Sequence, residues 1–211
     1  MATPDKSPID EASEHAGGGQ PLARYELLLC VTGGIACYKA ADLASKLTRS
    51  GASVTAALTE NACRFVAPLT FQAVTRNRVF TDLWPDTGDH DSGHISLTER
   101  ADLMIIAPAT ANTIGKIACG LADDLISTMA MSAAGACEIL VAPAMNSRMW
   151  NSPALQDNIK TLDARGVRFV GPNDGPLACG TTGPGRMSEP YEIVSAIISI
   201  LENTAPKSDR T

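Results

Sequence analysis

Residues 25–59 read YELLLCVTGGIACYKAADLASKLTRSGASVTAALT, and this stretch decides the fold. Its two ends, 25–32 and 53–59, are apolar runs of strand length, whereas residues 36–51 between them carry apolar side chains at helical spacing. Gly51 stands where such a helix would end, because glycine often follows a helix C-terminus. A strand, a helix and a second strand in this order predict a βαβ unit, and therefore a parallel sheet.

The same alternation continues along the chain. Three further runs are apolar at nearly every position, which is typical of strands that helices cover on both faces. These predicted strands lie at residues 102–108, 138–143 and 167–171. The predicted helices cover residues 111–120 and 121–133, a segment that starts at Pro153 behind the cap Ser152, and residues 189–201 behind the cap Ser188. The sequence therefore predicts a three-layer α/β/α domain with a parallel sheet of five or six strands, flavodoxin-like or Rossmann-like in its winding.

The composition fits one domain between two polar ends. Of the 211 residues, 45% are hydrophobic and 19% are charged, which suffices for one sizeable core. We expect disordered tails at residues 1–24 and 204–211, which are poor in residues to bury, and a single domain at residues 25–203.

Charge and hydropathy weigh against several classes of partner. The formal net charge of -6 argues against a protein that neutralises nucleic-acid phosphates. No apolar run approaches the roughly 18 residues that cross a bilayer, and the polar N-terminus lacks a hydrophobic signal region. We therefore expect a cytoplasmic protein that acts on a small molecule. None of the six cysteines has the spacing of a zinc site, so we expect no metal site. Without an export signal, the thiols are expected to be reduced.

Glycine and short polar side chains follow the predicted strands, at the sheet edge where ligands bind in such folds. After the first strand, a tight turn at a helix start would offer backbone N–H groups to a phosphate, or would serve packing alone; its residues are Gly33, Gly34 and Ile35. After the strand at 102–108, short polar side chains suit either a bound mononucleotide or a helix cap; they are Thr110, Asn112 and Thr113.

Four more residues are candidates by their chemistry. Phe65, after the second strand, could stack on a flat ring or belong to the core. Asn146 carries a donor and an acceptor, which suits a carboxylate, although turns also favour asparagine. His94 could act as a base near neutral pH or be structural, and Met149 is more typical of packing than of chemistry.

The segment 177–190, LACGTTGPGRMSEP, is rich in glycine and contains Cys179 and Arg186. A surface loop with an inert cysteine is one interpretation. The other is a lid over a site, whose movement three glycines would allow: Gly180, Gly183 and Gly185.

Five segments occur together in one order: GGIACYK at 33–39, GHISL at 93–97, APATANTIGKIACGLADDL at 107–125, PAMNSRMW at 143–150 and ACGTTGPGRM at 178–187. In this combination the sequence resembles the flavin-containing cysteine decarboxylases, from about Leu27 to Leu201. The resemblance implies FMN as the cofactor. It also implies decarboxylation of 4′-phosphopantothenoylcysteine to 4′-phosphopantetheine in coenzyme A biosynthesis.

The implied reaction has a physical reason. Direct loss of CO₂ from an N-acylcysteine would leave a negative charge on the α-carbon with no electron sink beside it. If FMN first takes two electrons from the thiol-bearing carbon, a thioaldehyde forms, and the charge can then delocalise onto sulfur as an enethiolate. Return of the hydride to the enethiol, with a proton from the protein, gives the saturated thiol and makes the reaction redox-neutral.

The resemblance also assigns roles to the candidate residues. His94 is expected to assist deprotonation of the substrate thiol, and Cys179 to supply the proton of the reductive step. Asn146 is expected to hold the substrate carboxylate, with further substrate contacts from Met149 and Arg186. FMN contacts are expected from Gly33, Gly34, Ile35, Thr59, Phe65, Thr110, Asn112 and Thr113. Four candidates could bind the substrate phosphate: Arg148, Arg186, Lys116, or the backbone alone.

The resemblance also implies an oligomeric state, and the sequence departs from the family's pattern in two places. The family's members form trimers, some of them built into dodecamers, so we expect a homo-oligomer of one of these kinds. Thr181 stands where many members carry Asp. Many bacterial relatives continue into a ligase domain that does not follow in this sequence, which is therefore either a free-standing decarboxylase or a piece of a bifunctional protein. Two alternatives stay open: a peptidyl-cysteine decarboxylase acting on the C-terminus of a ribosomal peptide, which Cys179 disfavours, and a non-enzymatic relative that binds a protein phosphatase.

Overall fold

The apolar runs form one parallel sheet in the structure, a computed structural model that describes residues 20–83, 93–202 and 204–209. Within these residues the sheet has six strands in the order β3-β2-β1-β4-β5-β6. The strands are β1 (Glu26–Val31), β2 (Ser53–Leu58), β3 (Val79–Phe80), β4 (Leu103–Ala109), β5 (Glu138–Pro143) and β6 (Arg168–Phe169). β2 and β3 follow one another on one side of β1. β4 pairs with the other side of β1, and β5 and β6 continue the sheet outward from there. The predicted three-layer fold and strand number are confirmed.

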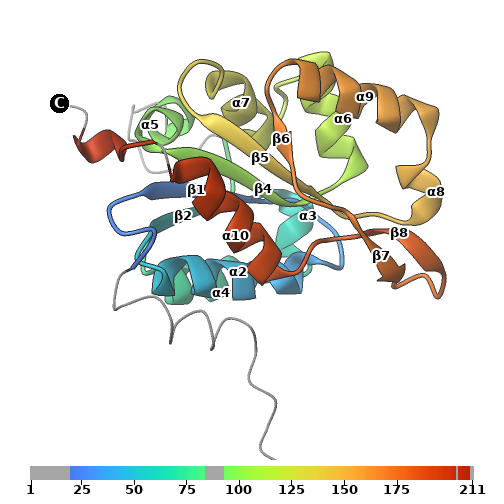
Figure 1. Ribbon diagram of the computed structural model, residues 1–211, viewed down its shortest axis with the longest axis horizontal. Coiled ribbons are helices and arrows are strands. Elements are labelled where there is room, and N and C mark those ends of the chain that lie inside the picture. The colour runs from blue at the N-terminus through green and yellow to red at the C-terminus, as the bar shows by residue number, and fades with distance from the viewer. Residues whose placement is uncertain (1–19, 84–92, 203, 210–211) are drawn as a thin grey trace, which may run out of the picture.

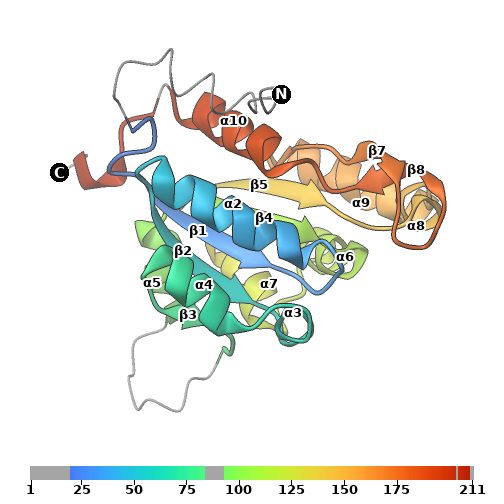
Figure 2. The same cartoon turned by 90° about the horizontal axis from the view of Figure 1, so that it is seen from below.

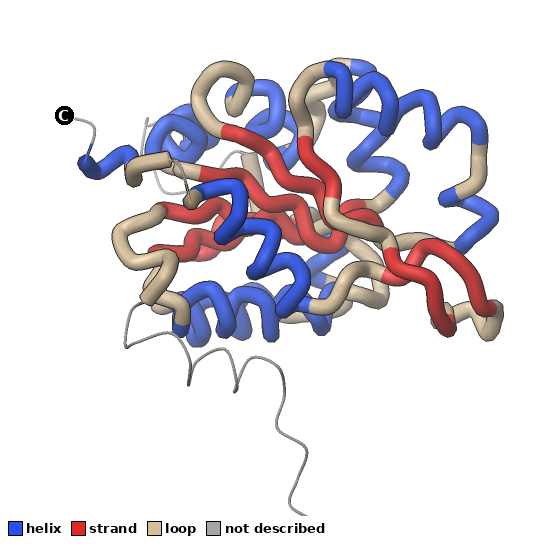
Figure 3. The backbone as a smooth tube through the Cα atoms, viewed as in Figure 1, coloured by secondary structure: helices blue, strands red, loops and turns tan. Residues whose placement is uncertain are grey.

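Helices cover both faces of this sheet (Figures 1–3). One layer consists of α2 (Cys37–Arg49), α4 (Pro68–Thr75) and α10 (Pro190–Leu201). The other consists of α5 (Gly93–Arg100), α6 (Ala111–Cys119), α7 (Leu125–Ser132) and α9 (Pro153–Ala164). Two short helices, α3 (Glu60–Cys63) and α8 (Ser147–Trp150), follow β2 and β5.

The strand β1 shows why its sequence is apolar at consecutive positions. Leu27, Leu29 and Val31 pack into the core beneath α2 and α10, whereas Leu28 and Cys30 pack into the core beneath α6 and α7. Side chains alternate between the two faces of a strand, and here both faces are covered.

Two predicted helix ends can be compared directly with the structure. Gly51 has a φ of +97° and lies just beyond the end of α2, as predicted. The prediction that Ser188 caps the last helix is wrong. Pro190 occupies the first helical position, so the cap is Glu189, whose backbone N–H donates to the Glu192 carboxylate at 2.6 Å.

The segment predicted as a glycine-rich loop forms a hairpin that extends from the sheet's carboxyl edge (Figure 1). It pairs β7 (Asn173–Pro176) with β8 (Thr182–Arg186) in antiparallel fashion. The period-2 alternation of apolar and polar residues that indicates a strand is absent here, so neither strand could be predicted from the residues.

Parts of the segments expected as tails contact the domain. Leu22 is fully buried, and the backbone N–H of Lys207, in a 3-10 helix at Lys207–Asp209, donates to Asp102 Oδ1 at 2.7 Å. Among the described residues, contacts with the domain therefore extend beyond residues 25–203 at both ends. Among the described residues, no helix combines the length and the hydropathy needed to cross a membrane.

The packing of β1 gives a stability prediction. Leu29→Ala should lower the free energy of unfolding by about 2–5 kcal/mol, because the side chain is fully buried and its removal leaves a cavity between strand and helix. Chemical denaturation measures the change. Leu69→Ala, at a leucine that is 70% exposed, is the matched control and should change stability by less than about 0.5 kcal/mol. Equal losses in the two variants would contradict the assigned core.

Candidate active site

A cavity of about 830 Å³ opens at the carboxyl ends of β1, β4 and β5. This is the place where the strand order changes direction, and doubly wound sheets bind ligands there. The hairpin β7–β8 forms another wall. Of the predicted site residues, the cavity brings together Gly33, Gly34, Ile35, Thr110, Asn146, Met149, Cys179 and Arg186.

Thr32 joins the two strands at the switch point. Its hydroxyl donates to the Pro108 carbonyl at 2.7 Å and accepts from the Thr110 N–H at 2.9 Å, and its side chain is buried. The loop after β1 and the start of α6 are therefore held at a fixed separation. Sequence reasoning missed Thr32, although a hydroxyl residue directly before the paired glycines was visible.

Gly33 lies against the loop that follows β2. A Cβ at this position would stand 2.4 Å from Asn61 Cβ, so no larger residue fits without movement of the backbone. In the same loop Thr59 caps α3 by accepting from the Ala62 N–H. Phe65 is 51% exposed, so it is not part of the core. Neither Thr59 nor Phe65 lines the cavity, and their predicted contacts with a cofactor stay predictions.

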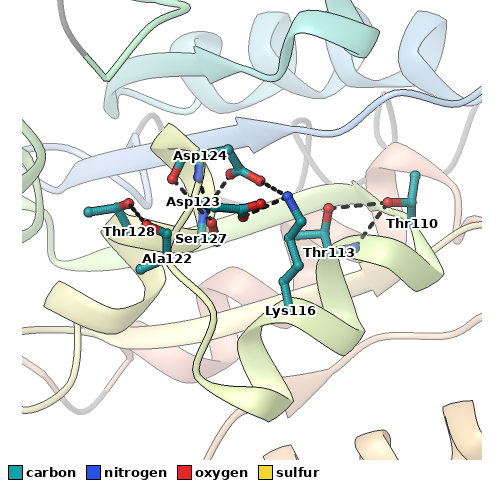
Figure 4. A network of polar contacts seen from close by, with 8 residues as sticks. All are labelled: Thr110, Thr113, Lys116, Ala122, Asp123, Asp124, Ser127 and Thr128. Carbon is teal, nitrogen blue, oxygen red and sulfur yellow. Dashed lines mark hydrogen bonds and ion pairs between the residues drawn. The ribbon is translucent and has the colours of Figure 1, made fainter.

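Two groups of polar contacts involve residues of α6 (Figure 4). Thr110 caps the helix, and its hydroxyl lies 3.1 Å from that of Thr113. Further along the helix, Lys116 Nζ lies 2.7 Å from carboxylate oxygens of both Asp123 and Asp124. The ammonium of Lys116 is thus engaged outside the cavity.

Two further predicted residues of α6 do not line the cavity. They are Asn112 and Thr113, and the Thr113 side chain is buried against the helix start. Their predicted contacts with FMN stay predictions.

Asp124 begins α7 with a capping box. Its carboxylate accepts from the Ser127 N–H, and the Ser127 hydroxyl accepts in turn from the Asp124 N–H. Burial favours the neutral acid, but the hydrogen bonds from Lys116 and Ser127 outweigh this effect and lower the pKa of Asp124.

Asn146 is held by the short helix α8. Its Oδ1 accepts from the Met149 N–H at 2.9 Å, so the amide oxygen is committed to capping the helix. Within the described part of the chain no hydrogen bond uses Nδ2, which leaves the amide hydrogens for an acceptor in the cavity. The arrangement suits a carboxylate.

The hairpin is bonded to the same loop as Asn146. The Met145 N–H donates to the Gly185 carbonyl at 2.9 Å, and a Cβ at Gly185 would stand 2.2 Å from the Met145 oxygen. The absence of a side chain at Gly185 therefore permits close backbone approach. Gly183 similarly contacts Ser147. In the structure these two glycines fit the hairpin against the loop, a role different from the predicted movement of a lid.

Three charged side chains share the base of the hairpin. Lys39 Nζ lies 2.8 Å from Glu189 Oε1 and donates to the Met187 carbonyl at 3.3 Å, and only 10% of its side chain is exposed. Arg186 Nη2 lies 2.7 Å from the same Glu189 oxygen. Lys39 lines the cavity and was missed in the sequence, where it looked like one more polar residue of an amphipathic helix.

Cys179 lines the cavity from the tip of the hairpin. Its sulfur lies 3.1 Å from the Thr181 hydroxyl. Hydrogen bonding by the hydroxyl and the backbone of Thr181 lowers the pKa of the Cys179 thiol.

The other end of the molecule holds His94. It belongs to α5, which packs against α7 and lies far from the hairpin in both views (Figures 1 and 2), so one chain does not bring His94 to Cys179.

A sequence profile of the flavoprotein family matches residues 18–202. The chain belongs to the flavoprotein family. This flavoprotein is 49% identical to the coenzyme A biosynthesis bifunctional protein CoaBC of Bacillus subtilis over 173 residues, which are 82% of the chain and 42% of the relative. It is 42% identical to CoaBC of Escherichia coli K12 over 178 residues, 84% of the chain and 43% of the relative. The chain thus spans less than half the length of these curated relatives.

Solved structures with the same fold cover most of this flavoprotein. A cysteine-to-serine mutant of a PPC decarboxylase, complexed with pantothenoylaminoethenethiol, has a TM-score of 0.78 and 34% identity, over 85% of this chain and all of that one. The FMN-binding protein AtHal3 has a TM-score of 0.76 and 34% identity, over 86% and 99% of the two chains. These matches confirm the predicted family and fold class.

The Lys116–Asp124 pair gives a pH-dependent stability prediction. Asp124→Asn keeps a helix cap but removes the charge, and should lower the free energy of unfolding at pH 7 by about 1 kcal/mol. The carboxylate has a lowered pKa when folded, so its contribution is present above the unfolded pKa and is lost as pH falls through the folded one.

Denaturation curves in a series from pH 7 into acid measure this difference, and the two proteins should converge as the pH falls through the folded pKa of Asp124. Asp157→Asn removes one partner of an exposed pair with Lys160 and serves as the control, with a smaller effect across the series. A deficit in Asp124→Asn that persists unchanged in acid would contradict a role for the ionised carboxylate.

Proposed function

We propose that this flavoprotein is an FMN-dependent decarboxylase that converts 4′-phosphopantothenoylcysteine to 4′-phosphopantetheine, a step of coenzyme A biosynthesis. One observation carries the proposal: a single cavity presents an amide donor, Asn146, and a thiol, Cys179, beside a glycine turn at a helix start. The CoaBC relatives and the PPC decarboxylase support the same activity.

The residues of the cavity fit a flavin mononucleotide. The cavity volume of about 830 Å³ lies in the upper part of the range of about 300–1,000 Å³ for small-molecule sites. No side chain caps α2, which begins at Cys37, and the turn at Gly33, Gly34 and Ile35 lies just before this helix start. The backbone N–H groups of the turn would donate to the phosphate. Thr110 would contact the ring system from the neighbouring loop. When bound, FMN takes two electrons from the substrate and later returns them.

Asn146 would hold the substrate carboxylate with its Nδ2 hydrogens. A neutral donor orients the carboxylate without forming an ion pair, which would stabilise the charged ground state against loss of CO₂. Met149, 44% exposed in the isolated chain, would pack on the substrate's apolar part. Arg186 stays a proposed substrate contact at the hairpin base, and Arg148 lies on α8.

Cys179 would donate a proton to carbon in the reductive step. The hairpin tip places its thiol at the cavity wall, and a lowered pKa makes it a better acid. A protein that released the enethiol would not need this group. The peptidyl-cysteine decarboxylase alternative is therefore less well supported, and the cysteine decarboxylase SpaF is 28% identical, below the PPC decarboxylase. The phosphatase-binding alternative does not use these groups.

We also infer that His94 reaches the cavity of a second copy. Within one chain, α5 lies at the opposite end of the sheet from the hairpin (Figure 2). Ile35 and Tyr38, which line the cavity, are 60% and 63% exposed, as expected for apolar surface that another copy covers in part. A trimer, or a dodecamer built from trimers, is the assembly we propose.

Hybrid oligomers test this sharing of the site. His94→Asn and Cys179→Ser chains should each fail to form the saturated thiol alone. Their coexpression should restore complete turnover at about a quarter of the sites if the two residues come from different chains and assort at random. Saturated product near zero in the mixed preparation would place both residues in one chain. Light scattering on the same samples establishes that mixed oligomers formed.

The role of Cys179 predicts a separation of the two half-reactions. Cys179→Ser should still release CO₂, because decarboxylation precedes protonation, but the enethiol should accumulate and the saturated thiol should fall by at least about 100-fold. Mass spectrometry resolves the two products by two hydrogens. Normal yield of the saturated thiol in this variant would refute the assignment.

Asn146→Asp should affect the earlier step. The new carboxylate repels the substrate carboxylate, so both CO₂ release and product should drop together by at least about 100-fold. The comparison with Cys179→Ser is the control, since only Asn146→Asp should lower CO₂ release. Unchanged kinetics would argue against the contact.

A further inference from the structure

The tip of the hairpin holds Cys179 in a closed turn. β7 and β8 pair as far as Pro176 and Thr182, and the five residues between them form the tip. The Leu177 N–H donates to the Thr181 carbonyl at 2.8 Å, and the Gly180 N–H donates to the Leu177 carbonyl at 2.9 Å. Thr181 is therefore fixed by its own backbone, two residues from the cysteine.

The side chains of Cys179 and Thr181 meet across this turn. Sγ and Oγ1 are 3.1 Å apart, and either atom could donate while the thiol is neutral. Once the proton has left the sulfur, only the hydroxyl can donate. The contact therefore favours the form that exists after proton transfer. Desolvation opposes this effect without cancelling it, and the charge of Arg148 makes the smallest favourable contribution.

We propose that Thr181 is a positioning residue that donates a hydrogen bond to the Cys179 sulfur, aims the thiol into the cavity and stabilises the thiolate left by proton donation. The catalytic part of this inference rests on the proposed function. Two effects follow: the hydrogen bond restricts the cysteine rotamer, and it makes transfer of the proton to carbon less unfavourable. An aspartate at this position would do the opposite, because its carboxylate cannot donate and repels a thiolate.

Alkylation of Cys179 measures the contact without reference to catalysis. Iodoacetamide reacts with thiolates, so its rate at Cys179 against pH, followed by peptide mass spectrometry, gives the midpoint of thiol ionisation. Thr181→Val should move this midpoint to higher pH, and Thr181→Asp should move it by about one unit or more. Thr181→Ser retains the hydroxyl and should stay near the wild-type value. Thr182→Val is the matched control one residue further along, on an exposed side chain outside the cavity, and should shift nothing.

Product analysis on the FMN-loaded protein completes the experiment. Thr181→Val should release CO₂ at the wild-type rate, yield less saturated thiol and accumulate enethiol, and Thr181→Ser should restore the product. An unchanged alkylation midpoint in Thr181→Val overturns the proposal. A shifted midpoint in a protein whose wild type forms no product from 4′-phosphopantothenoylcysteine supports the contact and refutes the proposed function. If Thr181→Val does not fold, the midpoints of Thr181→Ser and Thr181→Asp decide, and equal values count against the hydrogen bond.

Discussion

The hydroxyl of Thr32 links the two strands on which the site depends. A doubly wound sheet opens where its strand order reverses, and here that opening lies between β1 and β4. Thr32 spans the gap with one donated and one accepted hydrogen bond, so the glycine turn after β1 and the start of α6 keep their relative position. Removal of this buried hydroxyl would lower the stability of the fold, because the Pro108 carbonyl and the Thr110 N–H would each lose a hydrogen-bond partner.

A second set of backbone contacts joins the remaining walls. The loop after β5 is bonded to β8 through Met145 and Gly185, and the base of the hairpin is bonded to α2 through Lys39. The cavity is thus formed by segments that are far apart in the sequence and that share only a few contacts. Two of the close approaches need a glycine, at Gly183 and Gly185, because a side chain there would collide with the segment after β5.

Most of the sheet could be predicted from the sequence, because strands covered on both faces must be apolar throughout. The two-residue strand β3 could not, because polar residues flank Val79 and Phe80 on both sides, whereas the equally short β6 lies within the predicted run at 167–171. The motifs located the walls of the cavity, including Asn146 and Cys179. They did not identify Thr32 or Lys39, whose importance lies in partners distant in sequence. The position of His94 also could not be foreseen, because it depends on where α5 packs.

The link between Met145 and Gly185 has a mechanical consequence. The residue after Met145 is the proposed carboxylate anchor, and the strand that contains Gly185 leads back to the tip with its thiol. Any swing of the hairpin that admits a ligand must pull on this bond or break it. A displacement of the hairpin would therefore displace the proposed anchor as well, so the geometry of the thiol and that of the anchor depend on one backbone contact.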